Sequence, residues 1–180
     1  DAVHLPAALA VLLIVLALVR SGAVPSAASP SPSPSLSSRA SSASAARIPL
    51  PDTRKAQRVL VTVGTTNFDV LIGELLRPKC GIVVALQSRL RLAALTVQLG
   101  ATTEFEEEDV MRRLGELVGP DVQLKVFKLK QGGLDAEIDE ADLVLGHAGA
   151  GTLLDVCRRR RPFIVVVNTA LMDNHQSEMA

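Results

Sequence analysis

The sequence contains no tryptophan and no tyrosine, and only four phenylalanines among its 180 residues. Hydrophobic residues nevertheless make up 48% of the chain, so a core must be built from leucine, valine, isoleucine and alanine. Continuous runs of these side chains are typical of parallel strands that are buried on both faces and covered by helices. The lack of aromatic residues therefore favours a buried parallel sheet flanked by helices.

Excess charge and paired cysteines are lacking as well. The 19 basic residues balance the 19 acidic residues, so the net charge gives no indication of a nucleic-acid partner. Cys80 and Cys157 are isolated from each other and from any histidine cluster, which provides neither metal-ligand spacing nor a disulfide framework. Cysteines used in this way favour a reducing compartment.

The N-terminal part of the chain divides into two segments that do not look globular. Residues 1–20 include an uninterrupted apolar run of 13 residues at 7–19, shorter than the roughly 20 residues that span a bilayer. A membrane anchor, the core of a cleaved signal peptide, an organelle-targeting segment and an artefactual leader all stay open for it. Arginines on its C-terminal side would place the rest of an anchored chain in the cytoplasm. Residues 21–57 are rich in serine and proline and predict a disordered linker.

Residues 58–180 carry the pattern of one globular domain. Expected strands are 58–64, 95–100, 122–130, 142–146 and 162–168, and expected helices are 65–76, 106–119, 133–141 and 149–160. Residues 80–94 fit either a strand and a turn or a continued helix, and a last helix is expected to start at Asn174. The alternation predicts an α/β fold with a Rossmann-like parallel sheet. The period-two pattern of 122–130 indicates an edge strand.

Two glycine-containing loops follow predicted strands, at the edge where open parallel sheets bind ligands. They are GTTNFD at 64–69 and GHAGAGT at 146–152. Glycines let a ligand approach the backbone, and the helix after the second loop offers unpaired N–H groups to an anion such as a diphosphate. Each loop alone is equally explained as a tight turn, and His147 either contacts a ligand or hydrogen-bonds the backbone. A third polar cluster, Asn174 to Gln176, follows another strand and would converge on the same crevice.

Three motifs together resemble a known family. VTVGTTNFD, ADLVLGHAGAGTLLD and NTALMDNHQSEMA occur in this order over most of residues 58–180. They resemble the C-terminal, donor-binding domain of glycosyltransferase family 28, and within it the catalytic subunit of the dolichol-linked UDP-N-acetylglucosamine transferase. The resemblance implies the donor-binding half of a GT-B fold.

The same resemblance implies an activity and its partners. The expected reaction is inverting transfer of GlcNAc from UDP-GlcNAc to GlcNAc-diphosphodolichol, at the cytosolic face of the endoplasmic reticulum membrane. A membrane-anchored partner subunit would bind the dolichol-linked acceptor and supply the general base, and no metal or other cofactor is expected. Two alternatives stay open: a non-catalytic UDP-sugar-binding or regulatory protein, and a family 28 transferase with another lipid acceptor.

The resemblance also implies a set of donor-binding residues. Gly64, Thr65 and Thr66 would approach the diphosphate, and Asn174 and Gln176 would bind the sugar hydroxyls. The remaining implied residues line the pocket: His147, Ala148, Gly149, Ala150, Gly151, Thr152 and Asp155.

The sequence also departs from the family pattern. Asp155 stands where the family usually has a glutamate that holds the ribose hydroxyls, so the reach of this side chain is shorter. Residues 77–94 fit the family poorly, and the domain is expected to be truncated after the third motif.

Overall fold

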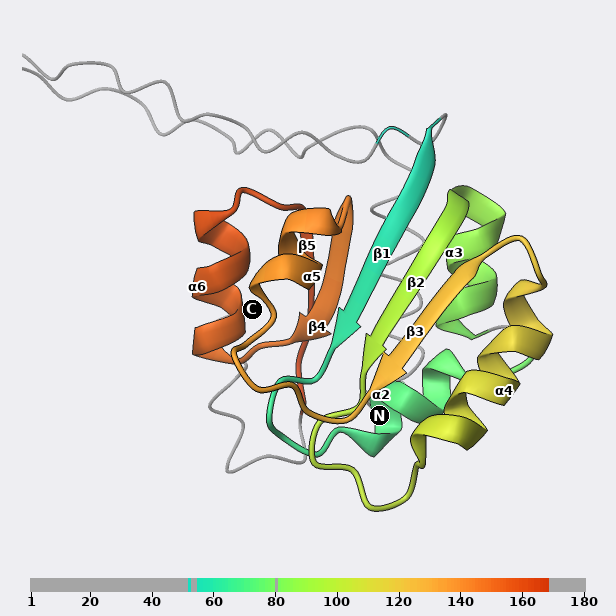
Figure 1. Ribbon diagram of the computed structural model, residues 1–180, viewed down its shortest axis with the longest axis horizontal. Coiled ribbons are helices and arrows are strands. Elements are labelled where there is room, and N and C mark those ends of the chain that lie inside the picture. Colours follow the sequence, from blue (N-terminus) through green and yellow to red (C-terminus); the bar gives the residue numbers. More distant parts are fainter. Residues whose placement is uncertain (1–51, 53–54, 80, 169–180) are drawn as a thin grey trace, which may run out of the picture.

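The computed structural model describes residue 52, residues 55–79 and residues 81–168 (Figure 1). The apolar segment at 1–20, nearly all of the predicted linker, and the cluster that contains Asn174 and Gln176 lie outside the described residues. Ala56 and Gln57, which the sequence pattern assigns to the linker, form the start of the first strand.

The described residues form a five-stranded sheet in which every pair of neighbouring strands is parallel. The strand order is β3-β2-β1-β4-β5. This confirms the predicted α/β class, the parallel sheet and the edge position of the third strand. The strands are β1 (Ala56–Thr62), β2 (Arg91–Gln98), β3 (Gln123–Phe127), β4 (Leu143–His147) and β5 (Phe163–Val166).

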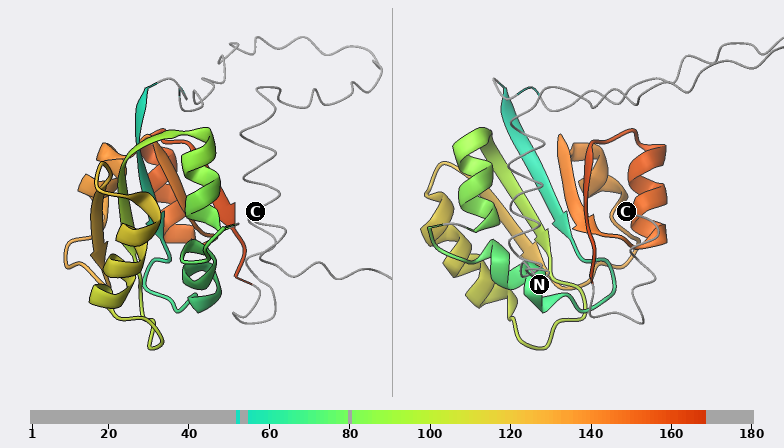
Figure 2. Two further views of the ribbon diagram at one scale, coloured as in Figure 1. Left: turned by 90° about the vertical axis from the view of Figure 1, so that its right-hand side faces the viewer. Right: turned by 180° about the vertical axis from the view of Figure 1, so that it is seen from behind.

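Helices cover both faces of this sheet (Figures 1 and 2). One face packs against α2 (Asp69–Leu75), α3 (Ile82–Arg89) and α4 (Glu107–Val118), and the other against α5 (Asp135–Glu140) and α6 (Ala150–Arg158). Alternation along β1 explains both contacts: Val59 and Val61 belong to the cluster beneath α2–α4, whereas Leu60 packs with α5 and α6. Because both faces are buried, β1 reads as a continuous apolar run.

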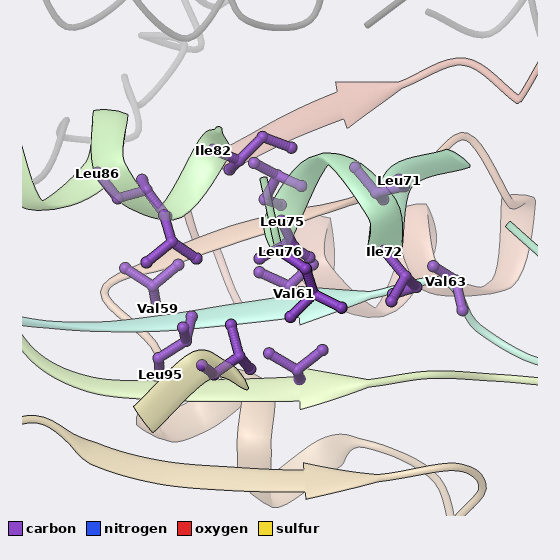
Figure 3. Packing of buried hydrophobic residues seen from close by; sticks show 14 of the residues in the cluster. Val59, Val61, Val63, Leu71, Ile72, Leu75, Leu76, Ile82, Leu86 and Leu95 are labelled. Atoms are coloured by element: carbon purple, nitrogen blue, oxygen red, sulfur yellow. The ribbon is translucent and has the colours of Figure 1, made fainter. Parts of the chain in front are cut away.

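Aliphatic side chains fill the larger of the two cores, as the scarcity of aromatic residues predicts. Figure 3 shows the valines of β1 meeting leucines and isoleucines of α2 and α3. The labelled members of this cluster are Val59, Val61, Val63, Leu71, Ile72, Leu75, Leu76, Ile82, Leu86 and Leu95.

The segment 80–94 matches neither of the two alternatives that its sequence allows. It contains the helix α3 and then the first half of β2, which starts at Arg91 rather than at the predicted residue 95. Ile82 and Leu86 are buried on one face of α3, whereas Leu90 already has extended backbone. The apolar run Ile82–Leu86 is too short for its periodicity to separate a buried helix from a buried strand, so tertiary packing decides between them.

Among the described helices, none combines the length and the apolar character that crossing a bilayer requires.

Leu95 is a direct test of the larger core. Its side chain in β2 is fully buried, so Leu95→Ala is expected to lower the free energy of unfolding by about 2–5 kcal/mol through lost burial and a residual cavity. Urea denaturation measures this loss. The control is Val70→Ala in α2, where 56% of the side chain is exposed and a change within about 0.5 kcal/mol is expected. Equal effects of the two substitutions would contradict the described packing.

Candidate ligand-binding cleft

The strand order changes direction at β1, and a cleft lies at this point. The chain runs from β1 outward to β2 and β3, then returns to place β4 on the other side of β1. The connections that follow β1 and β4 pack on opposite faces of the sheet, and this leaves a crevice beyond the carboxyl ends of these two strands. The cleft there has a volume of about 370 Å³. Its lining residues are Gly64, Thr65, Gln98, Leu129, Lys130, Gly133, Leu134, Ile138, His147, Gly149, Gly151, Thr152 and Asp155.

The first glycine loop is a hydrogen-bonded turn after β1. Gly64 has a φ of 63°, a left-handed conformation that favours glycine, and its N–H donates to Thr62 Oγ1 at 3.0 Å. Thr66 Oγ1 donates to the carbonyl of Val63 at 2.9 Å, and the Thr66 carbonyl accepts from the Ala101 N–H at 3.0 Å. Thr66 therefore stabilises the turn and is absent from the cleft lining, and the helix predicted from residue 65 starts only at Asp69.

His147 connects the two loops. It is the last residue of β4 and only 5% exposed, whereas the sequence pattern places it in the loop after the strand. A side-chain carbon added to Gly64 would overlap Cε1 of this ring, and one added to Gly149 would overlap Nε2. Both loops therefore need glycine where they pass the imidazole.

The environment of His147 keeps its ring neutral. Burial lowers the pKa of the imidazole from its ordinary value of 6.5. Nδ1 is buried, and no hydrogen bond of the ring to any described residue is formed. The ring therefore does not play the backbone-bonding role that the sequence allows. A neutral imidazole has one donor and one acceptor nitrogen, which is useful for contacting a polar ligand.

The second glycine loop leads into the N-terminus of α6. Gly149 is the N-cap, and neither a capping side chain nor an acidic residue is present in the first turn. The first N–H with a helical partner is that of Leu153, which donates to the Gly149 carbonyl at 2.9 Å. The preceding N–H groups, together with the helix dipole, favour an anion at this position. A side chain added to Gly151 would meet nothing within 4 Å, so the approach to these groups is open.

Asp155 lies one turn further along α6 and lines the same cleft. Its carboxylate forms an ion pair with Arg158 at 3.5 Å. This position is compatible with the ribose contact that the family resemblance implies, which stays a prediction.

The structure brings together most of the predicted site residues. The predicted residues that line the cleft are Gly64, Thr65, His147, Gly149, Gly151, Thr152 and Asp155. Ala148 is buried and Ala150 is exposed, and neither is part of the lining. Asn174 and Gln176 lie outside the described residues.

Sequence reasoning missed the wall of the cleft that β2, the loop between β3 and α5, and α5 itself contribute. The missed residues are Gln98, Leu129, Lys130, Gly133, Leu134 and Ile138. Two signals could have found part of this wall: a glutamine that ends the apolar run LTVQ, and the Gly132–Gly133 pair after the third strand. Both stand at carboxyl ends of strands.

A buried carboxylate holds Lys130 at this wall. Glu137 Oε1 accepts from Lys125 at 2.7 Å, and both carboxylate oxygens accept from Lys130, at 2.9 and 3.0 Å. Burial by itself would raise the pKa of Glu137, but the hydrogen bonds from the two ammonium groups outweigh it and lower this pKa to about 2. Two lysines share this one carboxylate, and of the two only Lys130 lines the cleft.

Metal-ligating side chains do not gather in the described part of the chain: no group of three or more His, Cys, Asp or Glu side chains could hold an ion there. The expectation that the reaction needs no metal stays a prediction.

Comparison with known proteins agrees with the resemblance that the three motifs carry. The glycosyltransferase family 28 C-terminal domain matches residues 58–180. A relative from Mus musculus, UDP-N-acetylglucosamine transferase subunit ALG13, is 35% identical over 128 residues, which are 69% of this chain and 10% of the mouse protein. A relative of the same name from Cryptococcus neoformans is 33% identical over 143 residues, with 68% of this chain and 70% of that protein covered. This chain thus spans about a tenth of the mouse protein's length.

A solved structure supports the fold. The crystal structure of MurG from Acinetobacter baumannii superimposes with a TM-score of 0.53 at 19% identity, over 70% of this chain and 33% of that chain. Together with the family match, this confirms the fold predicted from the resemblance, the C-terminal half of a GT-B glycosyltransferase.

The contact between His147 and Gly149 predicts a coupled mutational effect. Gly149→Ala places a methyl group against the imidazole ring and is expected to cost about 1–3 kcal/mol of unfolding free energy through overpacking. In a His147→Ala background the same change should cost much less, because the opposing atoms are gone. Urea denaturation of the four proteins in this cycle gives the coupling. Gly151→Ala, two residues away in open space, is the control and should not destabilise.

The lowered pKa of His147 predicts a pH dependence of stability. Between the lowered pKa and 6.5 the unfolded chain binds the proton more readily than the folded chain, so stability rises with pH and falls as the solution is acidified. Acidification from about pH 7.5 to about 5.5 should destabilise the natural protein more than His147→Gln. The favourable contribution of Glu137 is lost only below 4.5, toward about 2, and does not interfere. Identical pH profiles for the two proteins would contradict burial of a neutral ring.

Proposed function

The chain belongs to the glycosyltransferase family 28 C-terminal domain family, and from this premise we propose that it is the donor-binding subunit of a UDP-N-acetylglucosamine transferase. The relatives named as subunits of such a transferase support this donor. The proposed reaction adds the second GlcNAc to GlcNAc-diphosphodolichol with inversion at the anomeric carbon.

One observation carries the proposal: the uncapped N-terminus of α6 opens into the cleft beside Gly64 and His147. Unpaired N–H groups, the positive end of a helix dipole and glycines in both loops suit a diphosphate that must come close to the backbone. Lys130 adds a positive charge at the opposite wall. The cleft volume of about 370 Å³ is in the range of small-molecule sites.

In the proposed reaction, an acceptor hydroxyl oxygen attacks the anomeric carbon as the bond from that carbon to the diphosphate oxygen breaks. The bond electrons leave with UDP, and the hydroxyl proton passes to a general base. The N–H groups of α6 face the position where the negative charge grows, which lowers the energy of the transition state. The neutral His147 ring contributes a polar contact without adding a charge to the cleft.

The acceptor, the general base and the membrane attachment belong to the proposal as well. A partner subunit anchored at the cytosolic face of the endoplasmic reticulum membrane would bind the lipid-linked acceptor and supply the base. The relatives are named as subunits, which supports a partner. We expect no metal requirement, so transfer should persist in the presence of a chelator.

The decisive experiment combines the full chain with its membrane partner and measures transfer from UDP-GlcNAc to GlcNAc-diphospholipid. The expected product is the chitobiosyl diphospholipid, and either component alone should give none. An intact complex that makes no product would overturn the proposal. Calorimetry that then shows UDP-GlcNAc binding would support a non-catalytic UDP-sugar-binding protein instead.

The role of the α6 N-terminus predicts the effect of Gly151→Val. The new side chain has free space, so the fold should persist, but it covers the N–H groups that face the cleft. The KM for UDP-GlcNAc should rise about tenfold or more, which corresponds to about 1.4 kcal/mol of lost binding. Leu154→Val on the same helix is the control, because Leu154 is 53% exposed and does not line the cleft. An unchanged KM in Gly151→Val would place the diphosphate elsewhere.

A further inference from the structure

Gln98 is a polar side chain in an unusual place. It is the last residue of β2, is only 4% exposed, and lines the cleft beside the first glycine loop. Its neighbours along the strand, Val97 and Leu99, are fully buried in the larger core. An amide at such a position loses its contacts with bulk water and needs hydrogen-bond partners.

Only one end of this amide has a hydrogen-bond partner among the described residues. Thr62 Oγ1 accepts the Gly64 N–H at 3.0 Å, so its own proton is free to donate to Gln98 Oε1, at 2.5 Å. This chain of bonds fixes the oxygen of the amide toward Thr62 and leaves Nε2 on the other side. Nε2 makes no hydrogen bond to any described residue, and it is not among the buried unpartnered atoms, so it reaches the cleft surface.

The surroundings indicate which part of a UDP-sugar meets this amide. Gln98 ends β2 and the apolar Leu129 follows β3, so both lie on the β2–β3 side of the cleft, whereas the N-terminus of α6 follows β4. Leu134 and Ile138, at the start of α5 and within it, add further apolar lining. Apolar side chains suit the flat faces of a base better than the hydroxyl groups of a sugar. With the diphosphate at α6, the nucleoside end is the part that fits toward Gln98.

We propose that the side-chain amide of Gln98 donates a hydrogen bond to an acceptor oxygen of the nucleotide moiety of the donor, and that Thr62 is the positioning residue that orients this amide. The proposal rests on the proposed function, because it takes the occupant of the cleft to be a UDP-sugar. It assigns a donor-binding role to a residue outside the two glycine loops.

Isothermal titration calorimetry of the full chain with UDP and with UDP-GlcNAc tests the proposal. Gln98→Met keeps the length of the side chain but removes both N–H donors, and the Kd for UDP should rise about tenfold or more. The Kd for UDP-GlcNAc should rise by the same factor, since the contact is to the shared nucleotide. The matched control is Gln123→Met on β3, which is exposed and outside this cleft. An unchanged Kd in Gln98→Met, or a loss confined to UDP-GlcNAc, would overturn the assignment.

The positioning role of Thr62 has its own pair of variants. Thr62→Ser keeps the hydroxyl that orients the amide and should bind UDP within about twofold of the natural protein. Thr62→Val has nearly the same shape but loses the hydroxyl, and its Kd should rise toward that of Gln98→Met. Equal affinities of the serine and valine variants would show that the hydroxyl does not orient Gln98 for binding.

A measurement on the natural protein guards against variants that do not fold. The side-chain amide signal of Gln98 in a ¹⁵N–¹H correlation spectrum should shift when UDP is added. A signal that stays in place while backbone signals of the glycine loops move would overturn the contact. If the natural protein binds neither UDP nor UDP-GlcNAc, the proposed function fails together with this inference. If it binds and transfers normally while the Gln98 signal and the Gln98→Met affinity do not change, only this inference fails.

Discussion

β1 lies at the centre of the sheet, and its two edges and two faces organise the elements around it. Its backbone is hydrogen-bonded to β2 on one side and to β4 on the other, and both of its faces are covered by helices. The connections that leave β1 and β2 therefore pack on one face, and those that leave β3 and β4 pack on the other. Because these connections diverge to opposite faces at the carboxyl ends of β1 and β4, the cleft opens at this position of the sheet edge.

The cleft gathers polar groups that lack hydrogen-bond partners among the described residues. His147 and Gln98 are both almost fully buried, yet each has a polar nitrogen without a hydrogen-bond partner among the described residues. The N-terminus of α6 is uncapped as well. The Gln98 amide and the α6 N–H groups reach the cleft, where solvent or a ligand can satisfy them, and departures of this kind concentrate at functional sites. The same groups provide the donors that an oxygen-rich, anionic ligand requires.

The charged residues of α5 and α6 have different roles near the cleft and at the far end of α6. Near the cleft, the buried Glu137 fixes Lys130 and keeps its charge because two lysines hold it. At the far end of α6, Arg159 forms ion pairs with Asp135 at 2.8 Å and Asp139 at 3.2 Å, which join α6 to α5. The first arrangement shapes the binding wall, whereas the exposed carboxylates of the second contribute little stability individually.

The class of fold, the parallel sheet, its edge strand and the two glycine loops were predictable before folding was considered, because each depends on local patterns of apolar and small residues. The helix at Ile82–Arg89 was not predicted uniquely, since the short apolar run Ile82–Leu86 fits a helix or a strand equally well. The folded structure was needed to show that Thr66 stabilises a turn and that Gln98 and Lys130 complete the cleft. The reason is physical: these residues are brought together by strands that are distant in the sequence, and pairing between strands leaves no periodic signal in either one.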